Sequence, residues 1–295
     1  MARRPVPPEL ATGPFHVTRA AGVVGRGTLV GPSYRRLLHS VYQAADLTVD
    51  HGTMISAVRE AGAGEVLCGP SAAWALGCRL ADPDGPVHLS TGRGGTGRDA
   101  AVIARHRADL TPAEIVETPW GLSTSPARTA VDLARGIGTG HAGYVGGVVW
   151  VDGLLRATAL PAAQARGALI SAVGLRGLTR ARAVIRAARD GVDSPRETQL
   201  RLMVVRFGFP EPQVQCPVPD GRGHPVAHLD LGWGLRRVGL EYDGAVHRER
   251  DQHSGDLRRL NEVRSLGWHV LQIDNWAFSR PGAWLRQLDT LVPRR

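Results

Sequence analysis

In the C-terminal third of the chain, apolar residues first recur at helical spacing and then alternate as they do in β-strands. The apolar stripe of the predicted helix consists of Leu200, Met203, Val204 and Phe207. The capping box Ser194-Pro195-Arg196-Glu197 begins this helix. The elements expected after it are strands near 213–217, 226–231 and 237–243, a helix near 256–266, a strand over 269–274 and a helix near 282–291. The pattern therefore predicts the order helix, three strands, helix, strand, helix.

The N-terminal part mixes shorter helical and extended segments. Residues 15–43 suggest short helices followed by an extended piece, and the segment 34–42 places Arg35 and Arg36 just before an expected strand. A small helical domain with a trailing hairpin is one form of DNA-binding winged helix, which makes Arg35 and Arg36 candidate nucleic-acid contacts. An ordinary basic surface explains the same pattern equally well.

The middle of the chain is expected to combine strands and helices. The elements predicted here are a helix over 71–77, strands at 86–90 and 101–106, a helix from Pro126 capped by Ser125, and helices within 140–191. The Gly/Arg-rich loop 91–98 lacks the lysine and the strand–loop–helix context of a nucleotide-binding loop, so a turn is the better interpretation. The segment 190–193 interrupts the helical pattern. We therefore predict an α/β (α+β) fold, with a mixed helical and winged-helix-like region over 1–192 and a second domain over 193–295.

Length and composition indicate a globular protein. A chain of 295 residues with 43% hydrophobic and 21% charged residues is long enough for two domains with sizeable cores. No apolar run approaches the ~18 residues of a membrane span, and the N-terminal arginines and prolines do not resemble a secretion signal. Three cysteines without metal-type spacing favour reduced thiols, so we expect a cytoplasmic protein without a membrane partner.

The positive charge of the side chains comes from arginine alone. The net charge is +9, and all 36 basic residues are arginine, with no lysine in the sequence. Guanidinium groups keep their charge and bind phosphates in a forked geometry, so such a surface suits a nucleic-acid partner. Basic charge without further evidence is equally consistent with a solvated surface.

The main candidate site is a group of carboxylates on the second and third strands of the C-terminal region. Because side chains alternate along a strand, Glu241 and Asp243 share one face. Neighbouring strands lie roughly 4.8 Å apart, so Asp230 can reach the same patch. Carboxylates held this close repel one another unless a cation lies between them, and a hard divalent cation such as Mg²⁺ or Mn²⁺ is the usual solution. We therefore expect Asp230, Glu241 and Asp243 to be metal ligands.

Several of these residues also have a structural interpretation. Glu197 is adequately explained by helix capping, and Asp243-Gly244 by a turn. Glu241 is also compatible with an exposed strand position. Asp230 lies between two leucines, where an unpaired carboxylate is expensive to bury, and this favours a ligand role. Trp268 and Trp276 are expected in the core.

These residues and this element order resemble the restriction-endonuclease-like superfamily, whose signature is written PD-(D/E)XK, and more closely its very-short-patch-repair endonuclease group. The resemblance covers about the last hundred residues and rests on the segments 229–230, 241–247, 256–261 and 266–271. It implies an αβββαβ core in which strand carboxylates hold Mg²⁺ for phosphodiester hydrolysis. More loosely, the region before it resembles the N-terminal part of abortive-infection type IV antitoxins.

The chain departs from the superfamily signature at the lysine that helps to activate water. Asp243 stands at that position. The short-patch-repair group also lacks lysine there, and a nearby histidine does related work. The resemblance therefore implies Asp243 as an additional ligand and His247 as general base or acid. Glu197, at the start of the upstream helix, is a further candidate catalytic carboxylate. His247 is equally compatible with a structural hydrogen bond.

Two arginines follow on the next predicted helix. The resemblance implies Arg258 and Arg259 as nucleic-acid contacts. Pairing of Arg259 with Asp256 along the helix, at i and i+3, is the simpler interpretation.

The favoured hypothesis is a metal-dependent endonuclease, with DNA as the expected substrate. The alternative is a DNA-binding, antitoxin-like regulator in which the nuclease fold is catalytically inactive. A nuclease directed at RNA is a third hypothesis. The sequence leaves open whether two chains pair as a homodimer to cut both strands.

Overall fold

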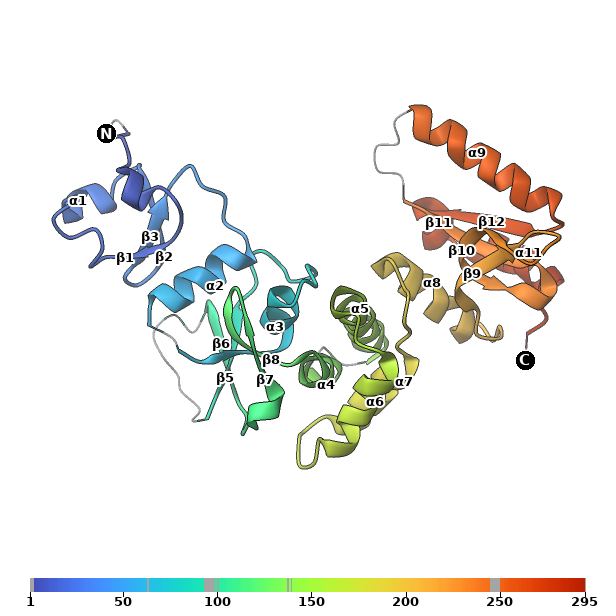
Figure 1. Ribbon diagram of the computed structural model, residues 1–295, viewed down its shortest axis with the longest axis horizontal. Coiled ribbons are helices and arrows are strands. Elements are labelled where there is room, and N and C mark those ends of the chain that lie inside the picture. The colour runs from blue at the N-terminus through green and yellow to red at the C-terminus, as the bar shows by residue number, and fades with distance from the viewer. Residues whose placement is uncertain are drawn as a thin grey trace. The chain divides into compact units, whose positions relative to one another are not determined.

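The computed structural model describes residues 3–62, 64–92, 99, 101–136, 138, 140–244 and 250–294, and leaves the side chains of 250–257 outside the description. The chain divides into two compact units. Unit 1 consists of Met1–Gly136 with Ala157–Arg182, and unit 2 of Ile137–Arg156 with Ala183–Arg295. Both units mix helices and strands, as the α+β prediction requires (Figure 1). Within the described residues, no helix combines the length and apolar character needed to cross a membrane.

Unit 1 begins with a three-stranded sheet of order β1-β3-β2. Its elements are the 3-10 turn η1 (Pro8–Leu10), β1 (Phe15–His16), α1 (Arg26–Leu29), β2 (Tyr34–Leu38) and β3 (Val41–Ala44). The prediction of several short helices here is wrong, because Phe15 starts a strand and α1 is a single turn. Frequent glycines between β1 and β2 lower the helical propensity of that segment. Arg35 and Arg36 lie within β2 rather than before it.

A five-stranded sheet of order β6-β5-β4-β8-β7 forms the second part of unit 1. Its strands are β4 (Val66–Leu67), β5 (Val87–Thr91), β6 (Ile103–Arg107), β7 (Ile115–Thr118) and β8 (Gly121–Thr124), with η2 (Pro112–Glu114) before β7. The accompanying helices are α2 (His51–Glu60), α3 (Gly69–Ala75), α4 (Pro126–Gly136) and α6 (Ala162–Ser171). The strands expected at 86–90 and 101–106 and the helix from Pro126 are confirmed. The sequence did not predict β4, β7 and β8, because strands this short carry little periodic signal.

Unit 2 includes most of α5 (Gly140–Thr158) and the second half of α7 (Leu178–Ala187). The boundary predicted after residue 192 therefore falls inside this unit. The physical reason is Asp152 of α5, whose carboxylate accepts hydrogen bonds from the backbone N–H of Arg189, the hydroxyl of Thr198 and the guanidinium of Arg201. Asp152 and Arg201 are each 1% exposed, and Arg201 belongs to α8 (Pro195–Arg206). This buried ion pair joins α5 to the C-terminal part of the chain.

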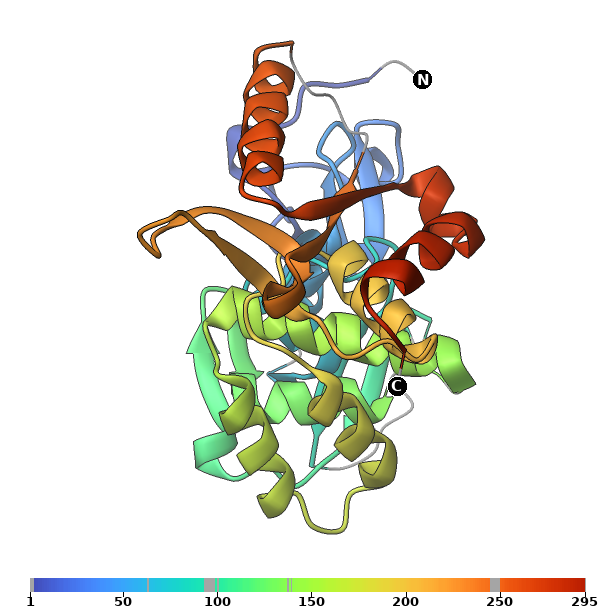
Figure 2. The ribbon, with the colours of Figure 1, turned by 90° about the vertical axis from the view of Figure 1, so that its right-hand side faces the viewer.

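The sheet of unit 2 has the strand order β12-β11-β10-β9. Its strands are β9 (Gln213–Pro219), β10 (Pro225–Trp233), β11 (Val238–Asp243) and β12 (His269–Asp274), with η3 (Gly234–Arg236) between β10 and β11. The first three are antiparallel neighbours, and β12 runs parallel to β11. Figure 2 shows β9 and β10 as one long hairpin. With α9 (Arg250–Ser265), α10 (Asn275–Ser279) and α11 (Gly282–Leu291), the elements follow the predicted order, except that α10 is an addition.

Helices pack against both faces of this sheet. On one face, Leu200 of α8 and Leu288 of α11 belong to a core that includes Leu240. On the other face, Val263 of α9 packs in a cluster with Leu229. The sheet is therefore the middle layer of unit 2, and α9 lies above one end of it in Figure 1.

The two tryptophans expected in the core have different environments. Trp268 is 5% exposed and belongs to the cluster under α9. Trp276 is 64% exposed, so the prediction for this residue is wrong. It lies on the short helix α10, which Asp274 caps at its first turn, and the guanidinium of Arg280 lies 5.3 Å from its ring centroid.

Candidate functional site

A polar cavity in unit 2 brings together the three carboxylates predicted as metal ligands. Its lining residues are Asp230, Glu241, Tyr242, Asp243, Arg259, Leu260 and Gln272, and its volume is about 140 Å³. They come from β10, β11, β12 and α9. We call this space the carboxylate cavity.

Strand register explains why Asp230 and Glu241 meet. The last registered pair of the β10/β11 ladder on this side is Leu231 with Leu240, and Asp230 and Glu241 are the next residues of the two strands beyond it. Both line the carboxylate cavity. Beyond that pair, the carboxylate of Asp230 accepts the backbone N–H of Tyr242 at 2.7 Å. On the other side, Glu241 is in register with Gln272 of β12.

Burial makes the negative charge of Asp230 costly. The pKa of Asp230 is raised from an ordinary value of 3.8 to about 6, and loss of solvent on burial is the largest cause. The neighbouring charges of Glu197 and Glu241 contribute to this rise, whereas the hydrogen bond from Tyr242 and the charge of Arg259 oppose it. The negative charges that act on Asp230 therefore come from two further carboxylates, Glu241 on β11 and Glu197 on α8.

Arg259 supplies a positive charge inside the carboxylate cavity. Its Nη1 lies 2.7 Å from Oε1 of Glu241, whose side chain is 10% exposed, while the Arg259 side chain is 38% exposed. The sequence suggested Asp256 as the partner of Arg259, and the Asp256 side chain lies outside the described residues. The pair with Glu241 could not be seen from spacing alone, because 18 positions separate the two residues in the chain.

Glu197 lies at the start of α8 and has structural partners. Ser194 caps the helix as predicted, with its Oγ accepting the backbone N–H of Glu197 at 3.2 Å. The Glu197 carboxylate accepts the backbone N–H of Asp193 at 3.0 Å and the amide of Gln215 at 3.3 Å. Gln215 has a φ of 45°, and such left-handed backbone in a strand is uncommon for a residue other than glycine. Glu197 thus influences Asp230 electrostatically without lining the carboxylate cavity.

The remaining candidate residues are distributed as follows. Asp243 lines the carboxylate cavity and is in register with Asp274 of β12. His247 lies outside the described residues. Arg258 is exposed on α9, and Arg35 and Arg36 are exposed on β2 in unit 1.

The donor atoms of the carboxylate cavity suit a hard cation. Carboxylate oxygens are the ligands that Mg²⁺ and Mn²⁺ prefer, and the charges of Glu197 and Glu241 act on Asp230 in opposition to that of Arg259. Among the described side chains, no three His, Cys, Asp or Glu residues form a ready metal-binding group. In the structure as described, the cation beside Glu241 is the guanidinium of Arg259.

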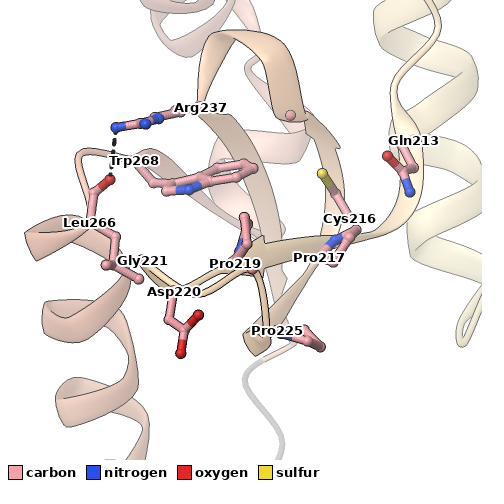
Figure 3. Close-up of a pocket in the computed structure, with 12 residues that line it drawn as sticks. Gln213, Cys216, Pro217, Pro219, Asp220, Gly221, Pro225, Arg237, Leu266 and Trp268 are labelled. Carbon is pink, nitrogen blue, oxygen red and sulfur yellow. Dashed lines mark hydrogen bonds between the residues drawn. The ribbon is translucent and has the colours of Figure 1, made fainter.

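A second cavity of unit 2, about 610 Å³ in volume, shares no lining residue with the carboxylate cavity. Figure 3 shows the indole of Trp268 between Arg237 and Leu266 at one end and the prolines of β9 at the other. Its two charged side chains already have structural partners. Arg237 donates to the carbonyl of Leu266 at the end of α9, and Asp220 accepts two backbone N–H groups of the β9/β10 turn.

Comparison with known proteins identifies relatives without an assigned activity. No family model matches the chain. The uncharacterized proteins MT2308 and Rv2248 of Mycobacterium tuberculosis, from strains CDC 1551 / Oshkosh and ATCC 25618 / H37Rv, are each 28% identical over 153 residues. These residues are 52% of this chain and 54% of each relative, so the chain spans about half the length of the curated relatives it matches.

One solved structure is also similar, the crystal structure of RV2827C protein from Mycobacterium tuberculosis. It covers 60% of this chain and 77% of its own chain, with 17% sequence identity and a TM-score of 0.33. A similarity of this size does not assign a fold.

Proposed function

We propose that unit 2 is a metal-dependent endonuclease that hydrolyses phosphodiester bonds, with DNA as its substrate. The observation that carries the proposal is the meeting of Asp230, Glu241 and Asp243, from two neighbouring strands, in one cavity. A carboxylate with a pKa raised by burial and by like charges is typical of functional sites.

The proposal includes a restriction-endonuclease-like core. Its support is the order α8, β9, β10, β11, α9, β12, in which three antiparallel strands precede a helix and a parallel strand. This is the αβββαβ order that the sequence resemblance implies. The carboxylates lie on the second and third strands, where the resemblance also expects them.

The residues of the cavity would have different roles in metal binding. Asp230 and Glu241 would hold one Mg²⁺ or Mn²⁺, with Asp243 as an additional ligand. When bound, the ion would lower the pKa of a coordinated water and stabilise charge on the phosphoryl group. Tyr242 fixes the orientation of Asp230 through its backbone N–H.

Proton transfer and substrate binding are assigned to other residues. The sequence has no lysine, so the lysine that stands two residues after the acidic residue in the superfamily signature is missing here. His247 is therefore the proposed general base or acid. Glu197 would act on Asp230 through its charge. Arg35, Arg36 and Arg258 are exposed and would bind the phosphate backbone of the nucleic acid.

Nicking of supercoiled plasmid tests the proposal. The wild type should nick DNA in Mg²⁺ or Mn²⁺, and Asp230→Asn and Glu241→Gln should not. Glu262→Gln is a matched control, because Glu262 is an exposed carboxylate on α9 that does not line the carboxylate cavity. Equal nicking by all four proteins would indicate a contaminating nuclease and remove the proposal.

A DNA-binding regulator with an inactive nuclease fold is the second candidate. The ion pair between Arg259 and Glu241 favours it, because a carboxylate that already has an internal cation has less need of a metal ion. This candidate predicts sequence-specific DNA binding in EDTA and no Mn²⁺ binding by calorimetry. Binding of Mn²⁺ that Asp230→Asn abolishes would exclude it.

A further inference from the structure

We propose that Arg259 is an internal counter-cation, which a divalent metal ion must displace from Glu241 before the site can act. The displaced guanidinium would then be available to bind the phosphate of the substrate. This inference rests on the proposed function, because it gives a role to a residue beside the proposed metal ligands.

The guanidinium and a metal ion compete for one carboxylate. Arg259 Nη1 lies 2.7 Å from Oε1 of Glu241, a charge-assisted contact to a side chain that is only 10% exposed. Asp230 lines the same cavity of about 140 Å³, together with Glu241 and Arg259. A metal ion bound to Asp230 and Glu241 would therefore stand close to the guanidinium, and like charges repel.

Arg259 is able to leave Glu241 without a change in the fold. Its side chain is 38% exposed, so the guanidinium has a short path to solvent. The next residue, Leu260, is 3% exposed, and Val263 is buried among residues of the sheet and Trp268. These anchors hold the backbone of α9, so the exchange requires a change of the Arg259 rotamer, in which Nη1 leaves Glu241 and the more distant carbonyl of His228 at 3.5 Å.

The released guanidinium can bind the phosphate of a substrate. A phosphate that approaches Asp230 and Glu241 meets two negative side chains, and it needs positive charge to approach closely. Arginine binds phosphate oxygens through two parallel N–H groups. Arg259 is attached beside the cavity, so the same side chain can neutralise Glu241 without metal and the substrate with metal.

Calorimetric titration of the full chain with Mn²⁺, without nucleic acid, tests the exchange. We expect Arg259→Gln to bind Mn²⁺ about tenfold more tightly than the wild type, because a competing positive charge is removed. Arg259→Lys keeps a cation at this position and should remain near the wild-type affinity. Arg264→Gln is the matched control, since it removes the same charge from an exposed position of the same helix that does not line the cavity, and it should leave Mn²⁺ affinity unchanged.

Plasmid nicking at saturating Mn²⁺ gives the second readout. Arg259→Gln should nick more slowly than the wild type although it binds the metal more tightly, whereas a purely structural role would weaken both. Wild-type Mn²⁺ binding together with equal or weaker binding by Arg259→Gln would overturn the counter-cation role and leave the metal site intact. Absence of Mn²⁺ binding in the wild type and in Arg259→Gln would overturn both the counter-cation role and the proposed function.

Discussion

The backbone N–H of Tyr242 donates a 2.7 Å hydrogen bond to the carboxylate of Asp230, beyond the last registered pair of the β10/β11 ladder. The side chain of Asp230 thus connects β10 to β11 by a hydrogen bond at the point where the backbone pairing of the two strands has ended. This hydrogen bond keeps Asp230 beside Glu241 and partly offsets the burial of its charge. The pH dependence of folding should report the balance between these effects.

Asp230→Asn should change the pH dependence of stability. Because the pKa of Asp230 is raised from 3.8 to about 6, the folded protein takes up a proton that the unfolded chain releases. The fold is therefore favoured below pH 4 and loses stability as pH rises through about 6. The free energy of unfolding of Asp230→Asn, relative to that of the wild type, should therefore rise by roughly 3 kcal/mol between pH 4 and pH 8.

Urea unfolding of both proteins in EDTA, at pH 4.5, 6 and 8, measures this difference. A difference between Asp230→Asn and the wild type that stays constant with pH would show that the charge of Asp230 is not destabilising.

Asp152 and Arg201 should contribute to stability as a unit. Each is 1% exposed, and the carboxylate also accepts hydrogen bonds from Arg189 and Thr198. Removing Arg201 leaves the buried charge of Asp152 without its cation, so Arg201→Met should cost about 3–5 kcal/mol. Asp152→Ala should cost less, because Arg201 keeps an ion pair with Glu211 at 3.0 Å. The double variant should cost clearly less than the sum of the two.

A double-mutant cycle by urea unfolding checks this coupling. Arg156→Met is the control, because its ion pair with Asp193 is largely exposed and should contribute little. Additive destabilisation in the double variant would mean that the two side chains stabilise the fold independently.

Local sequence signals located much of unit 2. Ser194 and Pro195 marked the start of α8, the alternation around Asp230 and Glu241 marked β10 and β11, and 269–274 and 282–291 are the observed bounds of β12 and α11. These features depend on residues that are close in the chain. Strand alternation was also sufficient to expect Asp230 and Glu241 in one place.

These local signals could not predict pairings between residues that are far apart in the chain. The ion pairs of Arg259 with Glu241 and of Arg201 with Asp152 depend on how distant elements pack, which periodicity does not report. Trp276 is exposed on the short helix α10, which was not predicted, and Asp274 both ends β12 and caps this helix. In unit 1, β4 contains only two residues and its partners come from two different parts of the chain.

Gly239 should be required for the packing of β11 against β10. An added Cβ would lie 2.2 Å from Cδ1 of Leu229, which is fully buried. Because the neighbouring core leaves Leu229 little room, Gly239→Ala should destabilise the protein by about 1–3 kcal/mol. Leu229→Ala should itself cost about 2–5 kcal/mol, and Gly239→Ala should cost less in that background than in the wild type.

Thermal unfolding of Gly239→Ala, Leu229→Ala and the double variant measures this relation. Gly221→Ala is a suitable control, because no atom lies within 4 Å of its added Cβ. If Gly239→Ala and Gly221→Ala unfold at the same temperature, the close approach of Leu229 is not a constraint on the fold.

Arg35 and Arg36 should contribute to nucleic-acid affinity through salt-dependent binding of phosphates. Both are exposed on β2, and removing one arginine that binds a phosphate should reduce the slope of log affinity against log salt by about 0.9. The double variant Arg35→Gln/Arg36→Gln should therefore bind duplex DNA more weakly, with a slope smaller by about 1 to 2. Arg166→Gln/Arg182→Gln removes the same charge from exposed positions of α6 and α7, where we expect a solvated face. Fluorescence anisotropy at 50 to 200 mM salt compares the two variants, and identical slopes would show that β2 supplies only general positive charge.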